Sequence, residues 1–98
     1  MSIVIIKLAP PAAHKQIMLT NDIMGISGLL HDRYEQIGVR CDLEGEEAAE
    51  EMFDLTNNPS RQEEREKKYG NRRSMSVGDV VQVGNDNYIC ASMGWRKL

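Results

Sequence analysis

The chain has 98 residues, the size of one domain, with an apolar fraction of 41% and a charged fraction of 28% that are typical of globular proteins. A formal net charge of −3 excludes nonspecific attraction of the whole surface to nucleic acid or to an anionic membrane. Because only 5% of the residues are aromatic, the core of this single domain, residues 1–98, must rely on aliphatic side chains. Formation of a homodimer would add to the stability of so small a core.

Residues 3–8 are almost all apolar and mostly β-branched, and they predict an N-terminal strand buried on both faces. Pro10 and Pro11 end this strand, because proline has no backbone N–H to donate. The apolar start is too short to cross a membrane, and it lacks the cationic start and cleavage site of a signal peptide. We therefore expect a cytoplasmic protein that does not contact a membrane.

A first helix is predicted from about Asn21 to Ile37, with capping side chains at residues 20–22. Its apolar side chains recur at helical spacing. They are Ile23, Ile26, Leu29 or Leu30, Tyr34 and Ile37. Gly38 is its expected C-terminal stop. Residues 39–43 are then either a short strand or a connector.

A second helix is predicted from Glu44 to Thr56. Its expected buried side consists of Ala48, Ala49, Met52, Phe53 and Leu55. The segment from Arg61 to Tyr69 is almost entirely charged and has no apolar stripe, so it is either a solvated helix or a loop. As a helix it would gain from two i,i+4 ion pairs, Glu63–Lys67 and Glu64–Lys68.

The C-terminal part predicts a β-hairpin, with turns at Gly78–Asp79 and at residues 84–87 and a strand after each turn. Trp95 either packs under the sheet or is an exposed interface anchor. The order of elements predicts an α+β domain. A small, mostly antiparallel sheet would join the N-terminal strand to the C-terminal hairpin, with two or three helices covering it.

The predicted second helix is strongly acidic: residues 42–54 contain seven carboxylates and no cation. Glu44, Glu47 and Glu51 fall on one helical face. Two interpretations remain open. The carboxylates form either a solvated outer face, helped at its start by the helix dipole, or an electrostatic patch for a basic protein partner.

The segment that follows is basic: residues 61–73 contain six cations and three glutamates. Its candidate contact residues are Arg65, Lys68, Arg72 and Arg73. These cations could contact a protein partner or follow the phosphates of a nucleic acid. They could also fold against the acidic helix of the same subunit or of a second subunit.

No pattern in the chain indicates catalysis or a cofactor. His14, His31, Cys41 and Cys90 are scattered without metal-ligand spacing, so we predict no metal and two buried free thiols. The serines lack a nucleophile elbow and the glycines lack a phosphate-binding pattern. We therefore predict that the protein is not an enzyme and binds no cofactor.

The run from Arg73 to Val81, followed by Tyr88 and Gly94–Trp95, resembles the ending RS-x-SVGDVV…Y…GW of small proteins carried by bacteriophages and other mobile elements. Phe53 with Thr56–Asn57 is similar to the F-x-x-TN helix end of that group. The resemblance covers roughly the C-terminal half, and the charged residues 61–68 depart from it. It implies a phage or mobile-element origin and implies no catalytic residue. Small proteins of such elements often bind one host protein.

These observations lead to one main prediction and one alternative. The main prediction is a non-enzymatic protein, in the cytoplasm of the host cell if phage-encoded, that binds and modulates a host or phage protein. Its predicted contact residues are Glu44, Glu47, Glu51, Arg65, Lys68, Arg72 and Arg73. The alternative is a nucleic-acid-associated accessory protein that uses the basic residues 61–73.

Overall fold

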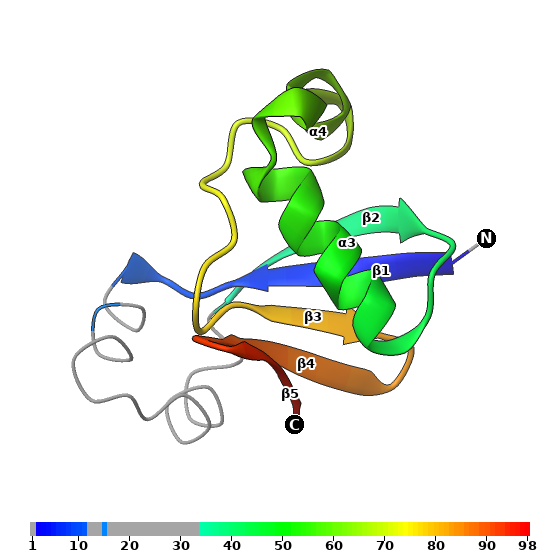
Figure 1. Cartoon of the computed structure of the whole chain (residues 1–98), viewed down its shortest axis with the longest axis vertical. Coiled ribbons are helices and arrows are strands. Elements are labelled where there is room, and N and C mark those ends of the chain that lie inside the picture. Colours follow the sequence, from blue (N-terminus) through cyan, green and yellow to red (C-terminus); the bar gives the residue numbers. More distant parts are fainter. Residues whose placement is uncertain (1, 12–14, 16–33) are drawn as a thin grey trace.

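The computed structural model describes residues 2–11, 15 and 34–98 (Figure 1). A five-stranded antiparallel sheet forms the body of this part of the chain, with the strand order β2-β1-β3-β4-β5. The strands are β1 (Ser2–Leu8), β2 (Glu35–Cys41), β3 (Val80–Val83), β4 (Asp86–Ala91) and β5 (Gly94–Lys97). The predicted α+β fold, with the N-terminal strand joined to the C-terminal strands, is confirmed.

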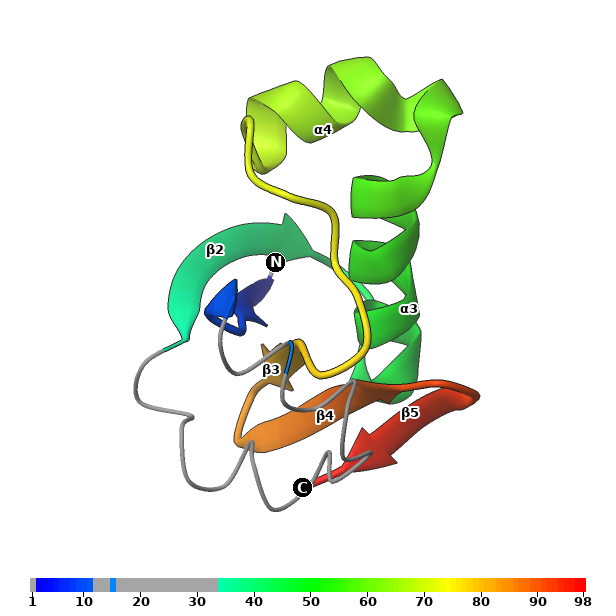
Figure 2. The same ribbon diagram turned by 90° about the vertical axis from the view of Figure 1, so that its left-hand side faces the viewer.

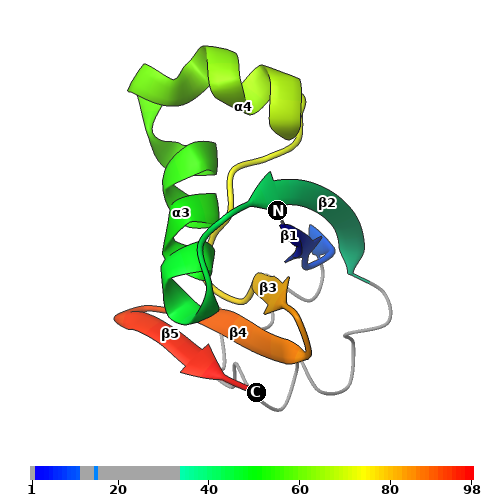
Figure 3. The same cartoon turned by 90° about the vertical axis from the view of Figure 1, so that its right-hand side faces the viewer.

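One helix lies on the sheet and a second packs against the first. Helix α3 (Gly45–Asn57) covers one face, and α4 (Gln62–Lys68) lies across its C-terminal end after a 3-10 turn at Pro59–Arg61 (Figures 2 and 3). Helix α3 was predicted, whereas the sequence left the segment of α4 as either a solvated helix or a loop; the helix forms, and it has no buried residue, as its composition indicates. Neither of these described helices is long and apolar enough to cross a bilayer.

The main core lies between α3 and the sheet. Val4 and Ile6 of β1 pack there against Met52 and Leu55 of α3, and all four side chains are at most 1% exposed. This confirms β1 as a central strand. The prediction that β1 is buried on both faces is wrong at Ile3, whose side chain is 64% exposed. On the neighbouring strand β2, Gly38 lies beside Ile3 and has no side chain to cover it.

Strand β2 corrects the predicted end of the first helix. Residues 35–37 are extended and paired with β1, and Gly38 lies in mid-strand opposite Ile5 instead of ending a helix. A Cβ at Gly38 would lie 3.3 Å from Cγ2 of Ile3, so the missing side chain gives Ile3 room. The alternating burial from Ile37 to Cys41 is the period of a strand. The predicted residues 21–33 of that helix lie outside the described part of the chain, and the strand alternative for residues 39–43 is confirmed as far as Cys41.

The opposite face of the sheet carries a second apolar cluster, which contains Val80 and Ile89 as cross-strand neighbours. Lys7 lies beside them on β1 and is only 5% exposed. Its Nζ donates a hydrogen bond to Oδ1 of Asn87 at 3.2 Å. Burial lowers the pKa of this amine below its ordinary value.

The C-terminal hairpin forms, and a further strand extends it. Gly84–Asn85 makes the turn between β3 and β4, and Gly84 has φ +62°, as tight two-residue hairpins require. Strand β5, which was not predicted, places Trp95 against α3. There its ring meets Phe53 edge to face at 6.3 Å between centroids, and its Nε1 donates to Oε1 of Glu50 at 2.6 Å. Trp95 is therefore half-buried and fastens β5 to the helix.

Candidate binding surface on helix α3

The outward face of α3 is a continuous acidic surface. Its carboxylates recur at i, i+3, i+4 and i+7, the spacing that keeps side chains on one side of a helix. They line an open depression of about 510 Å³ formed by Leu43, Glu46, Glu47, Glu50, Glu51 and Asp54. Leu43, which is 42% exposed, adds an apolar side chain to this surface. We call these six residues the acidic depression.

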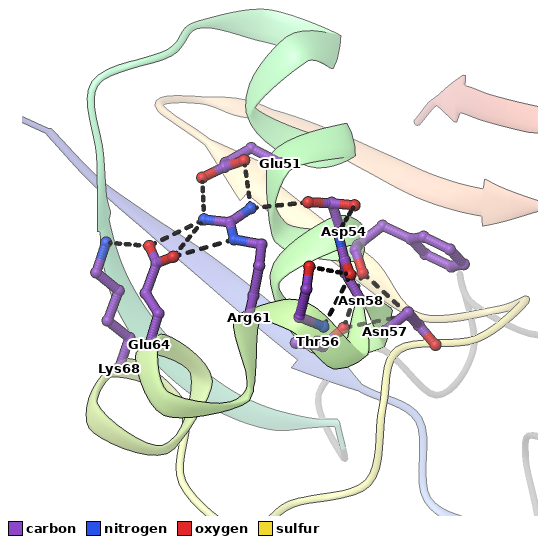
Figure 4. Close-up of polar contacts among 10 residues, drawn as sticks. Glu51, Asp54, Thr56, Asn57, Asn58, Arg61, Glu64 and Lys68 are labelled. Atoms are coloured by element: carbon purple, nitrogen blue, oxygen red, sulfur yellow. Dashed lines mark hydrogen bonds and ion pairs between the residues drawn. The ribbon is translucent and has the colours of Figure 1, made fainter.

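The C-terminal half of the acidic depression is bound by Arg61 from the same chain (Figure 4). The guanidinium donates to both oxygens of Glu51 at 2.8 and 2.9 Å, and to Oδ2 of Asp54 at 2.9 Å. It also contacts both oxygens of Glu64 on α4, each at 2.9 Å. Arg61 therefore bridges the two helices, and its side chain is only 19% exposed.

The contacts in this bridge shift the pKa values of Arg61 and Glu64. The hydrogen bonds that Arg61 donates to Glu51, Asp54 and Glu64 raise the pKa of Arg61 above its ordinary value. The bonds from Arg61 and Lys68 lower the pKa of the Glu64 carboxyl, and Nζ of Lys68 lies 3.1 Å from Oε2 of Glu64. Arg61 and Glu64 therefore both favour their ionised forms in this bridge.

The N-terminal half of the acidic depression, together with the neighbouring Glu44, is different. Glu44, at the start of α3, and Glu46 and Glu47 in its first turn are exposed. Within the described ranges, no cation lies at ion-pair distance from these three carboxylates. Glu50 accepts only the indole hydrogen bond of Trp95. The two ends of α3 therefore differ: among the described residues, the carboxylates near its start have no cation at ion-pair distance, whereas Glu51 and Asp54 near its end are paired with Arg61.

Arg65 anchors α4 to the loop that follows it. Its guanidinium donates to the carbonyl of Thr56 at 2.5 Å, to Oγ of Ser74 at 2.9 Å and to the carbonyl of Arg72. The same guanidinium lies over the ring of Tyr69, 5.4 Å from its centroid. Burial, together with the charge of a nearby carboxylate, raises the pKa of Tyr69 to about 12. Arg65 thus serves the packing of this loop.

Arg73 pairs with a buried carboxylate, Asp79, which is fully inaccessible to solvent. Nη1 and Nη2 of Arg73 donate to the two oxygens of Asp79, each at 2.7 Å. The backbone N–H groups of Ala9 and Ser76 also donate to Oδ1 and Oδ2 of Asp79, each at 2.8 Å. We call these four residues the Asp79 cluster. Because it joins the end of β1 to the loop before β3, the run from Arg73 to Asp79 has a structural role here.

The predicted contact residues therefore fall into separate places. Glu44, Glu47 and Glu51 lie on α3, and Lys68 lines a neighbouring depression of about 400 Å³ that shares Leu43 and Glu51 with the acidic depression. Arg72 donates to the carbonyl of Tyr69 and to Glu35. Together with Arg73, it lines a distinct depression of about 270 Å³ at the end of β1.

Several residues of this surface were not singled out as contact residues from the sequence. They are Leu43, Glu46, Glu50, Asp54 and Arg61. The idea that the basic segment folds against the acidic helix is confirmed at Arg61 alone. One sequence feature could have indicated this contact. The helix ends at Asn57–Pro59, only two residues before Arg61, so a chain reversal there places Arg61 close to the end of α3.

Both cysteines are buried free thiols, as predicted. Burial raises the pKa of Cys90 to about 11, so its thiol is protonated at neutral pH. Among the residues that the structure describes, no three His, Cys, Asp or Glu side chains are grouped to hold a metal ion.

Comparison of the chain with models of protein families, with curated proteins and with solved structures finds no match. We therefore infer function from the geometry and charge of the described surface.

Proposed function

We propose that this protein is a non-enzymatic binding protein that takes a basic protein partner on the acidic face of α3. The resemblance of the C-terminal half to mobile-element proteins leads us to propose a host or phage protein as this partner, and modulation of that protein as the result. Binding would place cationic side chains of the partner over the N-terminal half of the acidic depression, with Leu43 supplying apolar contact.

The carboxylates of α3 that have no cation at ion-pair distance among the described residues carry this proposal. Glu46, Glu47 and Glu50 repel one another across one helical face, which weakens the helix relative to a neutral surface. A basic partner would remove this repulsion on binding. It would also be attracted from a distance, since a surface of one sign increases association rates at low ionic strength.

The pairing of the basic segment supports a protein partner over a nucleic acid. Arg61, Arg65 and Arg73 direct their donors at carboxylates and carbonyls of this chain. Lys67 is exposed but stands 3.7 Å from Glu63. Few cations of this segment are therefore available to follow a phosphate backbone, which needs several at once.

The test is affinity capture from host lysate with mass spectrometry, comparing the natural chain with a Glu44→Lys/Glu47→Lys variant. Glu51 is left unchanged, because its reversal would break the contact with Arg61 and confound binding with stability. A Glu63→Lys/Glu66→Lys variant makes the same change in net charge on α4, away from the acidic depression.

We expect the α3 variant to lose the captured partner and the α4 variant to retain it. Equal capture by all three proteins would contradict the proposal. Salt-dependent retention on DNA or RNA that disappears in a Lys68→Gln/Arg72→Gln variant would instead support the nucleic-acid alternative.

A further inference from the structure

Arg61 is the one cation that the described structure seats in the acidic depression. Its planar guanidinium makes two parallel hydrogen bonds to Glu51 and a third to Asp54, a geometry that a lysine ammonium cannot reproduce. The fold therefore shows which group these two carboxylates accept. It also shows that the chain itself occupies them.

We infer that Arg61 is an internal competitor of the partner, and that the partner displaces it with an arginine side chain of its own. This inference rests on the proposed function of α3 and adds two properties to it. The first is a preference for arginine over lysine in the partner. The second is that the free protein holds part of its binding surface closed.

Displacement leaves Arg61 with a charge partner. Glu64 already accepts hydrogen bonds from Nε and Nη2 of Arg61 at 3.0 and 2.9 Å, and it moves with Arg61 because it stands three residues further along the same segment. A guanidinium that leaves Glu51 and Asp54 can remain paired with Glu64. The exchange therefore frees two carboxylates without exposing an unpaired cation.

The exchange also leaves α4 in place. Arg65 ties this helix to Thr56 and Ser74, and the buried ring of Tyr69 holds its C-terminal end. Neither contact involves Arg61. Because the polar contacts of Arg61 to α3 are partly exposed, a side-chain movement alone is sufficient to open the acidic depression.

The test measures binding of two synthetic probes of equal length, an oligo-arginine and an oligo-lysine peptide, by isothermal calorimetry. The variants are Arg61→Gln and, as a matched control, Lys67→Gln. Both remove one positive charge from the same segment, but Lys67 is 77% exposed and its Nζ lies 3.7 Å from Oε1 of Glu63. Arg61→Lys is the second variant, since it keeps the charge and loses the paired hydrogen bonds.

We expect the natural chain to bind the arginine probe more tightly than the lysine probe. Arg61→Gln should tighten binding of the arginine probe by about two- to fivefold, the upper part of the range expected for removing one competing ion pair. Lys67→Gln should change it by less than about twofold. Adding Glu51→Gln and Asp54→Asn to Arg61→Gln should cancel the gain.

Equal affinities of the Arg61→Gln and Lys67→Gln proteins would overturn the inference while leaving the proposed function intact, provided that Glu44→Lys/Glu47→Lys still abolishes probe binding. If neither probe binds the natural chain or the Arg61→Gln protein, both fail. Should Arg61→Gln not fold, Arg61→Lys decides. Unchanged preference and affinity for the arginine probe in that protein would overturn displacement.

Discussion

Helix α3 and the segment from residue 61 to residue 79 carry opposite charge, and they use it in different ways. Two arginines of the later segment are directed at groups of the fold: Arg65 donates to backbone carbonyls, and Arg73 donates to the buried Asp79. The carboxylates at the start of α3 are directed outward, without cations at ion-pair distance in the described structure. Density of charge in a sequence therefore does not reveal which charges a fold leaves available.

The reason for this difference lies in the side chains. A guanidinium has five donors on a long stem, so it can reach several carbonyls while its plane lies over a ring, as in Arg65 over Tyr69. Glutamates on an exposed helix face have no comparable donors within reach. The comparison predicts that substitutions in the basic segment act mainly on stability and that substitutions in early α3 act mainly on binding.

The largest effect is expected for Asp79→Ala. This change leaves the Arg73 guanidinium and two backbone N–H groups without their acceptor, and breaking such a buried pair costs about 3–5 kcal/mol of the free energy of unfolding. Urea denaturation measures the loss. The matched control is Asp86→Ala, whose exposed pair with Lys97 contributes about 1 kcal/mol at most. Similar losses in the two variants would mean that the Asp79 cluster does not hold the loop.

A second effect is expected in alkaline solution. Because the pKa of Tyr69 is raised to about 12 from 10.0, the folded protein keeps a proton that the unfolded chain releases. Stability from this group is therefore complete below pH 10 and is lost as the pH rises toward 12, by about 2–3 kcal/mol in total. The Tyr69→Phe protein should lack this part of the alkaline loss.

Urea denaturation across this pH range checks the prediction for Tyr69. Cys90, whose pKa is also raised by burial, is present in both proteins, so their difference isolates the phenol. Parallel stability curves for the natural and Tyr69→Phe proteins would contradict it.

Arg65→Met should lower the free energy of unfolding by about 2 kcal/mol, because hydrogen bonds from a charged donor to the carbonyls of Thr56 and Arg72 are lost while the apolar stem is retained. Lys67→Met is the control and should change stability by less than about 0.5 kcal/mol. Chemical denaturation compares the two. A small change in the free energy of unfolding of Arg65→Met would mean that Arg65 is available to bind a partner.

The smallest effect on stability is expected for Glu47→Gln. It removes repulsion from neighbouring carboxylates on α3, but it also removes a favourable charge near the helix N-terminus, so stability should change by less than about 0.5 kcal/mol. Partner capture should nevertheless decrease. Thermal melting and affinity capture, with Glu66→Gln as the control on α4, test this separation of binding from stability.

Sequence patterns predicted those helices and strands whose own apolar residues determine their secondary structure. Helix α3 has an apolar stripe and strand β1 has a nearly continuous apolar run, and both appear where they were expected. The first part of β2, residues 35–38, was missed because Tyr34 and Ile37 are three residues apart, a spacing that fits a helix, whereas the strand alternation becomes visible only from Ile37 to Cys41. Strand β5 has one large apolar residue, Trp95, and owes its conformation to pairing with β4.

The candidate surface was predicted only in outline. The spacing of Glu44, Glu47 and Glu51 gave their shared helical face, because that depends on local geometry. Pairing depends on tertiary contacts: Arg61 reaches Glu51 only because the chain reverses after α3, and Arg73 meets Asp79 beside a strand end 64 residues earlier in the chain. Local patterns do not encode such distances.

The central position of β1 also has a consequence during protein synthesis. This strand is made well before its neighbour β3, which begins at Val80, so one edge of β1 has no partner until Val80–Val83 has been synthesised. An open apolar strand edge is prone to pair with other chains. Completion of the sheet is therefore expected to depend on late emergence of Val80–Val83, and slow translation before this point should increase aggregation.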